Sequence, residues 1–488
     1  MNKNTACFIF FILMASSFPS YSKDLNPSNY QQTKSKKNYS FEWNQLKNEN
    51  TFQTISSFPT QDWWKQFNDP YLNEYIEKAI TNNTDYLIAK TRIDQAKYKA
   101  RRSLAQEFPV VEIGGDFTRQ RNSENLTSFP ISELQGGGPR IFAPGQTVNI
   151  YNTPLSVNYE LDPFFKKRLN TKSKQSLTQS AEWQARSVFN TLIAEVASSY
   201  FNLISTEEQI NHLKQITELD EDNIKLYEVL YSAGLIAQDE VNEAKKLLEQ
   251  NQEQLNSLKN TKEFFYNNLA FLMGEAPAEV NEIKHLKLAE LKTPEVLSTG
   301  LASELLFRRP DIVAAEYDLK SAGINVSAAR RAYFPSFNLA MQAGFSSINL
   351  GNLVSPESLL VALTASTVQT IFSAGQRRAD LNIAKAQKEE ALHYYQKTIL
   401  QSFKEVENVL ASYKESLKNN EVLNKQLNLQ LDNLKLFQAK YDQGLIPYQD
   451  LIMHKKKFIN LQKSLNENQA SLLINQISLY KALGSGQV

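Results

Sequence analysis

The sequence predicts a mixed α and β protein, built from a tandem repeat that joins long helices to short antiparallel strands. Three observations favour this fold class. One sequence pattern occurs twice, the longest segments repeat apolar residues at steps of three and four, and shorter segments alternate apolar with polar residues. After the N-terminus, no segment approaches the roughly 20 apolar residues that a membrane helix needs. If the chain crosses a membrane, it must do so as strands.

The repeat is visible as matched residues at constant offsets. Residues 231–236 (YSAGLI) recur as 441–446 (YDQGLI), an offset of 441 − 231 = 210. Upstream, Phe-Pro at 108–109 recurs at 334–335, an offset of 334 − 108 = 226. The difference, 226 − 210 = 16 residues, predicts an insertion in the first copy, which we place in the glycine-rich segment 120–146.

This pattern divides the chain into six segments. They are a signal peptide (1–22), an N-terminal segment (23–83), the first copy (84–274), a linker (275–309), the second copy (310–484) and a C-terminal tail (485–488). In order, each copy is predicted to contain a helix, two strands, a very long helix, a glycine turn and a returning helix. These elements are expected at 84–107, 110–161, 164–231 and 237–273, and again at 310–333, 336–372, 374–441 and 447–483.

The long segments are predicted to be helical because their apolar residues follow the spacing of a coiled-coil seam. In the second copy this seam consists of Ile399, Phe403, Val406, Leu410, Tyr413 and Leu417. A helix of about 68 residues is roughly 100 Å long, and the two shorter helices of a copy add up to roughly 92 Å. The near-match predicts that the short helices stack end to end beside the long one. A soluble helical bundle or filament would show the same heptads.

The strands are predicted from alternating apolar and polar residues. Clear alternation occurs in 111–117, 155–161 and 336–345, whereas 359–372 alternates less cleanly. Around Pro154 the alternation changes phase, which predicts a bulge or a bend. Such strands fit a membrane barrel with a wet lumen, and they fit a half-buried sheet of a soluble domain equally well. Four strands cannot close a barrel and lipid does not tolerate an open sheet edge, so the membrane interpretation requires oligomerisation.

The N-terminus has the features of a cleavable signal peptide. Lys3 supplies a positive charge, residues 6–15 form an apolar core, and small residues at 20–22 precede an expected cleavage after residue 22. Cys7 is the only cysteine and lies inside the apolar core, so we expect a mature chain without disulfides or a lipid-modified cysteine. The balance of 53 basic and 52 acidic residues gives no indication of a nucleic-acid partner.

No catalytic or metal-binding motif is recognisable in the sequence. The four histidines lack metal-ligand spacing, and no HExxH, CxxC, nucleophile elbow or phosphate-binding loop occurs. One polar motif is interpreted as a helix start, and its residues are Arg308, Arg309, Pro310 and Asp311. Proline at the first helical position and a carboxylate in the first turn stabilise a helix N-terminus. We therefore expect a protein without enzymatic activity, cofactor or bound metal.

Several motifs resemble those of the TolC-like outer-membrane efflux family, in the branch that serves RND-type multidrug pumps. They are Asp62-Trp63-Trp64 with Phe67 and Asp69-Pro70, 307–316 (FRRPDIVAAE), 329–335 (ARRAYFP), 371–375 (IFSAG) and 473–484. The resemblance implies a homotrimer in which three protomers of four strands each form a 12-stranded transmembrane β-barrel, continuous with a long periplasmic α-helical barrel. Many relatives in this branch carry a lipidated N-terminal cysteine, which this sequence lacks.

The resemblance implies the exit duct of a tripartite efflux system, which passively conducts small molecules such as drugs. Its partners would be a periplasmic adaptor protein, an inner-membrane RND-type pump and outer-membrane lipids. An alternative is the duct of an ABC-driven protein secretion system, which would share the fold. A third is a periplasmic coiled-coil structural protein without a pore. The alternating strands disfavour the third, and the FRRPD motif favours the first over the second.

The two glycine turns carry the candidate functional residues. Gly234 and Gly444 each join a long helix to a returning helix, which predicts left-handed helix terminators. The resemblance places these turns at the periplasmic tips, where the adaptor-contacting residues would be Gly234, Leu235, Ile236, Gly444, Leu445 and Ile446. It also implies an acidic ring of Asp450 at the pore constriction. Met453 stands where many relatives carry a second aspartate, so we expect one acidic ring together with Gln449 or Met453.

Overall fold

The computed structural model describes residues 62–121, 123–125, 145–277, 283–291 and 309–484. The chain divides into two units, and every element below belongs to the unit of Ser57–Glu295 with Ser303–Val488. The predicted signal peptide, Arg308 and most of the predicted insertion lie outside the described residues. Among the helices in the described ranges, none is long and apolar enough to span a membrane.

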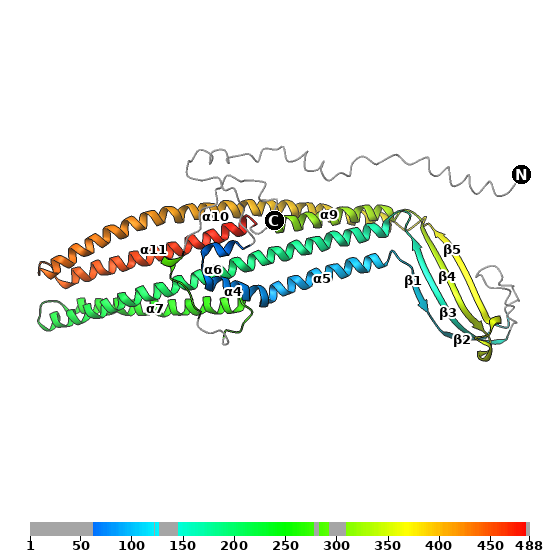
Figure 1. Ribbon diagram of the computed structural model, residues 1–488, viewed down its shortest axis with the longest axis horizontal. Coiled ribbons are helices and arrows are strands. Elements are labelled where there is room, and N and C mark those ends of the chain that lie inside the picture. The colour runs from blue at the N-terminus through cyan, green and yellow to red at the C-terminus, as the bar shows by residue number, and fades with distance from the viewer. Residues whose placement is uncertain (1–61, 122, 126–144, 278–282, 292–308, 485–488) are drawn as a thin grey trace, which may run out of the picture. The chain divides into compact units, whose positions relative to one another are not determined.

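Both copies contain the expected order of elements (Figure 1). The first copy comprises α5 (Thr84–Ala105), β1 (Val110–Ile113), β2 (Asp116–Arg121), β3 (Thr147–Leu161), α6 (Lys166–Ser232) and α7 (Gln238–Leu272). The second comprises α9 (Pro310–Arg331), β4 (Ser336–Ser347), β5 (Leu359–Val368), α10 (Gln376–Asp442) and α11 (Tyr448–Ala482). Every predicted helix begins and ends within two residues of its expected bounds, because glycine turns and heptads are local signals.

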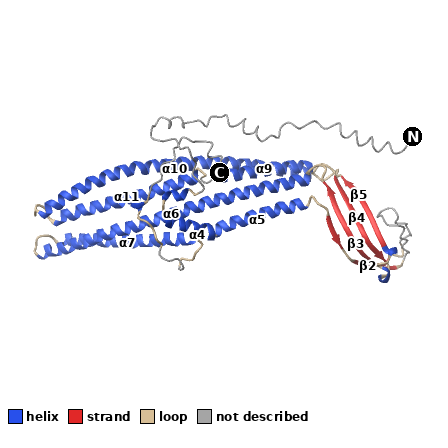
Figure 2. Cartoon of the chain, viewed as in Figure 1, coloured by secondary structure: helices blue, strands red, loops and turns tan. Residues whose placement is uncertain are grey.

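The helices pack side by side around α6, which contacts α5, α7, α9 and α11, while α10 packs on α9 and α11 (Figure 2). The predicted end-to-end stacking of the short helices is confirmed at two equivalent junctions. Asn83 donates from Nδ2 to the carbonyl oxygen of Leu272 at 3.0 Å, which joins α7 to α5. Arg309 donates from Nη1 to the carbonyl oxygen of Ala482 at 3.0 Å, which joins α11 to α9. The junctions keep the repeat offsets, 309 − 83 = 226 and 482 − 272 = 210.

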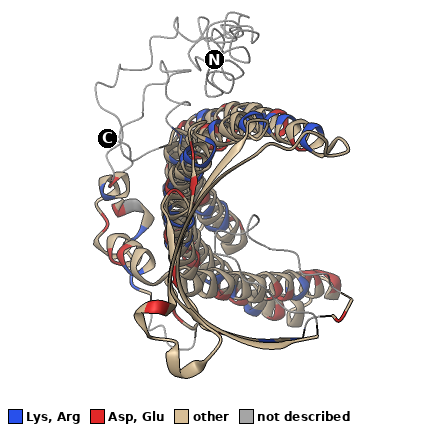
Figure 3. Cartoon of the chain, turned by 90° about the vertical axis from the view of Figure 1, so that its right-hand side faces the viewer, with Lys and Arg blue, Asp and Glu red and all other residues tan. Residues whose placement is uncertain are grey.

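The strands form one antiparallel sheet in the order β1-β3-β4-β5, with β2 also paired to β3. The register confirms the predicted alternation, because apolar residues of neighbouring strands lie opposite one another. Val157 pairs with Met341, which pairs with Leu363, and Ser156 and Gln342 occupy the next row. Strands β4 and β5 contain no charged residue, and Figure 3 shows little charge on the strands compared with the helices. Between Leu155 and Leu161 of β3, the sheet therefore has one apolar and one largely polar face. Towards the β2 end this pattern reverses, because Val148 and Ile150 lie on the polar face.

Of the bulge or bend predicted at Pro154, the bulge is wrong. Strands β3 and β4 keep one register through Pro154, which lies opposite Gly344. The interruption is in the neighbouring strand, where the first expected strand divides into β1 and β2, yet both pair with β3 in the same register. Proline has no N–H to donate, so the hydrogen-bond ladder is broken there without insertion of an extra residue. Gly114 still donates its N–H to the Pro154 carbonyl oxygen at 2.9 Å.

The N-terminal segment adds a 3-10 turn, η1 (Trp63–Phe67), and helix α4 (Pro70–Asn82), which were not predicted as elements. Trp63 stacks on Tyr480 of α11, with ring centroids 5.0 Å apart. Fully buried Asp69 caps α4 and accepts a hydrogen bond from the Tyr200 hydroxyl of α6 at 2.6 Å. Burial and this carboxylate raise the pKa of Tyr200. The Trp-Trp-Phe-Asp motif thus fixes the N-terminal segment on the helices of both copies.

Candidate functional site

The two glycine turns between the paired helices have equivalent backbone geometry. Gly234 and Gly444 both have a φ of +72°. Beyond them, Leu235 donates its N–H to the carbonyl oxygen of Leu230, and Leu445 donates to Lys440, both at 2.9 Å. These bonds satisfy carbonyl groups that a helix C-terminus leaves unpaired. The predicted left-handed terminators are confirmed.

Side-chain exposure at the turns separates the leucines from the isoleucines. Leu235 is 71% exposed and Leu445 67% exposed, whereas Ile236 and Ile446 are half-buried. Each isoleucine precedes the N-cap of a returning helix, the position from which an apolar residue packs towards the fourth helical residue. Those fourth residues, Val241 and Leu451, are both buried. The expectation of four exposed apolar side chains therefore holds for the leucines, and we attribute the difference at the isoleucines to this capping geometry.

The residues expected at the constriction lie in the first two turns of α11. Gln449 and Asp450 are half-buried, and Met453 is 44% exposed. Asp450 stands in the first turn, where the helix dipole favours a carboxylate. Its charge acts on His454, whose pKa is lowered by burial and by Lys457 and raised in part by Asp450. The structure brings these three residues to one helix end.

A buried ionic cluster, which the sequence did not predict, connects the two copies. Asp220 of α6 is 2% exposed and forms an ion pair with Lys456 of α11, whose side chain is 18% exposed. Asn251 of α7 donates from Nδ2 to the second oxygen of Asp220 at 2.7 Å. Helices α6 and α7 of the first copy and α11 of the second copy thus meet at one carboxylate. Heptad patterns do not reveal this pairing, because its members are 236 residues apart.

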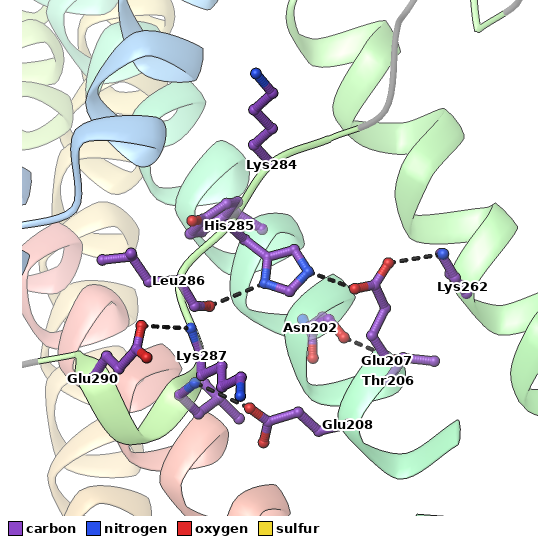
Figure 4. Close-up of polar contacts among 12 residues, drawn as sticks. Asn202, Thr206, Glu207, Glu208, Lys262, Lys284, His285, Leu286, Lys287 and Glu290 are labelled. Carbon is purple, nitrogen blue, oxygen red and sulfur yellow. Dashed lines mark hydrogen bonds and ion pairs between the residues drawn. The ribbon is translucent and has the colours of Figure 1, made fainter. Parts of the chain in front are cut away.

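A second unpredicted cluster docks the linker segment 283–291 on α6 (Figure 4). Nε2 of His285 lies 2.5 Å from Oε2 of Glu207, and Lys262 forms an ion pair with the other Glu207 oxygen at 2.8 Å. Glu208 accepts a hydrogen bond from the N–H of Leu288 at 3.1 Å. The linker is therefore held by two adjacent carboxylates of α6.

This linker contact is expected to depend on pH. The hydrogen bond to Glu207 raises the pKa of His285, so its stabilisation is complete below the ordinary histidine pKa of 6.5 and is lost as pH rises through the raised value. Burial acts to raise the pKa of Glu207, but bonds from His285 and Lys262 lower it, so its stabilisation is lost only as pH falls below 4.5. We expect hydrogen exchange, corrected for intrinsic rates, to show stronger protection of 283–291 at pH 6 than at pH 8.5.

The control for this experiment is a histidine that does not contact the linker. His285→Gln should remove the difference between the two pH values, whereas His393→Gln should preserve it, because His393 is exposed and bonds to Gln396. Equal protection of the wild-type linker at both pH values would contradict the assignment.

The helix-start residues form a structural junction. Arg309 is 7% exposed and donates to both carboxylate oxygens of Asp311, at 3.0 and 2.8 Å. It also donates to Glu405 of α10 at 2.7 Å, and Pro310 occupies the first position of α9. Arg308 lies outside the described residues. Within the described residues, no group of three or more histidine, cysteine, aspartate or glutamate side chains is placed to hold a metal ion.

Comparisons with known proteins agree with this architecture. The pattern of the family described as outer membrane efflux protein matches residues 75–275 and 301–485. The probable efflux pump outer membrane protein TtgC of Pseudomonas putida is 29% identical over 435 residues, which are 87% of this chain and 85% of TtgC. The solvent efflux pump outer membrane protein SrpC of Pseudomonas putida is 30% identical over 432 residues, 86% of each chain.

Solved structures show the same fold. The outer membrane channel CmeC of Campylobacter jejuni matches with a TM-score of 0.81 and 24% identity, over 91% of this chain and 92% of CmeC. The open state of the MtrE outer membrane channel of Neisseria gonorrhoeae matches with a TM-score of 0.77 and 26% identity, over 90% of this chain and 94% of MtrE. The mixed fold of long helices and an antiparallel sheet is therefore similar to that of both channels.

Proposed function

The chain belongs to the outer membrane efflux protein family, and from that premise we propose that it is the outer-membrane exit duct of a tripartite efflux system. It would conduct small molecules passively from a periplasmic pump assembly to the exterior. The observation that carries this proposal is the sheet. From Leu155 to Leu161 of β3 it has one apolar and one largely polar face, and β4 and β5 contain no charged residue. An apolar outer face and a polar inner face are what a membrane-embedded pore requires.

The two edges of the sheet support assembly with further copies of the chain. Within the described residues, β1 and β2 pair only with β3, and β5 pairs only with β4. Open edges carry unpaired N–H and C=O groups, which are costly in lipid. We propose that three protomers join edge to edge into a 12-stranded barrel, the number three being the one that the family resemblance implies.

The proposed partners are a periplasmic adaptor and an inner-membrane RND-type pump. Leu235 and Leu445 support the adaptor contact, because they are large apolar side chains left exposed at two equivalent turns. TtgC and SrpC are both described as outer membrane proteins of efflux pumps, which supports a pump as the partner. The description of SrpC names a solvent efflux pump, which favours apolar cargo. We further propose export through a signal peptide at 1–22 and a mature chain without lipid modification.

Reconstitution tests this function directly. The purified protein should be a detergent-dependent trimer that conducts ions in a planar bilayer, and its deletion should lower tolerance to drugs or solvents. A mature chain that stays monomeric and water-soluble without detergent would refute the membrane assignment. Loss of protein secretion with unchanged tolerance would favour the ABC-driven duct.

The acidic ring is tested by Asp450→Asn. Three carboxylates converging at the tip should attract multivalent cations, so divalent or trivalent cations added on the periplasmic side should block wild-type channels. The variant should show severalfold weaker block and lower cation selectivity in single-channel recordings, with the yield of trimer unchanged. Asp442→Asn is the control, because Asp442 is exposed before the turn and accepts a hydrogen bond from Gln438. Unchanged block in Asp450→Asn would move the constriction to Gln449 or Met453.

A further inference from the structure

Basic residues concentrate where the helices meet the sheet. Four segments cover these helix ends: 100–109, 160–170, 328–336 and 370–380. They contain nine basic residues, namely Arg101, Arg102, Lys166, Lys167, Arg168, Arg330, Arg331, Arg377 and Arg378. The acidic residues of the same segments are Glu107, Glu160, Asp162 and Asp380. At the end nearest the helices, the charge-free strands β4 and β5 are therefore flanked by an excess of positive charge.

Local helix stability explains the cations at the C-terminal ends of α5 and α9, Arg102, Arg330 and Arg331, but not the cations at the starts of α6 and α10. Cations are unfavourable at a helix N-terminus, yet α6 begins with Lys166, Lys167 and Arg168 and has no acidic residue in its first turn. The carboxylate that meets this helix start is Asp162, which accepts the N–H groups of Lys166 and Arg168 from before the helix. Helix α10 likewise begins near Arg377 and Arg378 without an acidic residue in its first turn. At the far end, α7 and α11 follow the rule, with Asp239, Glu240 and Asp450 in their first turns. The reversal is thus confined to the helix starts beside the sheet, in both copies.

Large apolar side chains are exposed beside these cations. In the loop before α10, Ile371 is 96% exposed and Phe372 is 85% exposed, and Phe165, before α6, is 50% exposed. The Arg168 guanidinium lies 5.2 Å from the Phe165 ring. Exposed aromatic and aliphatic side chains next to arginine are the composition of a membrane interface, where rings lie among the headgroups and cations reach phosphate.

The cluster is continuous with the apolar face of the sheet. Phe164 stacks on Phe334 at 4.5 Å and lies 6.3 Å from Phe337, which is paired with Leu161 on the apolar face. Lys167 differs from the other cations, because it forms an ion pair with Glu160 at 3.2 Å, and Glu160 belongs to the polar rows of β3. We therefore define the basic collar as the exposed cations, which are Arg101, Arg102, Lys166, Arg168, Arg330, Arg331 and Arg378.

We propose that the basic collar binds the phosphate groups of acidic phospholipids in the periplasmic leaflet of the outer membrane. This rests on the proposed function, which places the apolar face of the sheet in the membrane and the helices in the periplasm. Exposed apolar side chains enter the leaflet at the collar, and the adjacent cations meet the headgroups. The collar thereby fixes the depth at which the trimer lies in the membrane.

The test compares two equivalent pairs of cations on the same two helices. Arg168→Gln/Arg378→Gln removes collar charges related by 378 − 168 = 210, and Lys225→Gln/Lys435→Gln removes exposed charges related by 435 − 225 = 210 away from the sheet. Native mass spectrometry of the detergent-solubilised trimer would count bound phosphatidylglycerol against phosphatidylcholine from an equimolar mixture. We expect wild type to prefer phosphatidylglycerol and the collar variant to lose about tenfold of that preference, with the Lys225/Lys435 variant unchanged.

The outcomes separate this proposal from the channel function. Wild type without a preference for phosphatidylglycerol, or a collar variant that retains it, would overturn lipid binding by the collar. Conductance in neutral bilayers is measured on the same samples, and a variant that conducts normally but has lost the preference supports the proposal. If the glutamine variant does not assemble, Arg168→Lys/Arg378→Lys keeps the charge and must retain the preference, or the proposal fails.

Discussion

Replacement of Lys456 by methionine is expected to destabilise the protein by about 3–5 kcal/mol per protomer. The variant leaves Asp220, which is 2% exposed, with Asn251 as its remaining hydrogen-bond donor. An ionised carboxylate that loses its countercharge in a buried position keeps the cost of its desolvation without the compensating attraction. The effect should appear in denaturant titration of the detergent-solubilised protein at fixed protein concentration, since the stability of an oligomer depends on concentration.

A double variant distinguishes the cost of an orphaned charge from the value of the pair. Asp220→Leu/Lys456→Met removes both charges and should recover most of the stability lost in Lys456→Met, because apolar replacements of a buried pair are often neutral. Lys225→Met is the surface control, since both Lys225 and its partner Asp222 are exposed and water screens such pairs. If Lys456→Met lowers the free energy of unfolding no more than Lys225→Met does, the cluster does not hold α6 and α7 against α11.

The Asp220 cluster also shows which features the sequence could predict. Helix bounds, glycine turns and the apolar face of the sheet depend on neighbours within a few residues, so periodicity and repeat offsets located them. The partners of Asp220 and Glu207 depend on how whole helices pack, and no local signal marks Lys456 or His285 as the residue that meets them. The error at Pro154 has a related cause, because the phase change of the apolar residues has two readings. Either a residue is inserted or, as the register shows, Val148 and Ile150 lie on the opposite face from Leu155.

At the candidate site, the sequence could predict backbone geometry better than side-chain exposure. The turn at Gly234 follows from one glycine between two helical patterns, whereas the half-buried state of Ile236 depends on the cap of the returning helix. Whether Asp450 forms a ring depends on neighbouring protomers, and this remains a proposal. The basic residues of the collar are visible in the sequence. Only the sheet register and the ion pair to Glu160 show that Lys167 differs from the exposed cations.

The junction between α7 and α5 is expected to tolerate no side chain at Gly274. Gly274 and Gly234 have nearly the same backbone conformation, with φ of +73° and +72°, so alanine costs about 1–2 kcal/mol at either position for the left-handed conformation alone. A Cβ at Gly274 would also lie 2.5 Å from the carbonyl oxygen of Asn82, whereas a Cβ at Gly234 would have no atom within 4 Å. Backbone atoms cannot move aside as a flexible side chain can.

Gly274→Ala should therefore cost about 1–3 kcal/mol more than Gly234→Ala, because relief of the clash requires movement of α4 and α5 away from the end of α7. That movement also lengthens the hydrogen bond from Asn83 to Leu272, which is 3.0 Å long and buried. Denaturant titration of the two variants under identical conditions measures the difference, and hydrogen exchange should rise at 82–86 and 270–274 in Gly274→Ala only. Equal destabilisation of the two variants would mean that the left-handed conformation, and not the close approach of Asn82, is the reason for glycine at this junction.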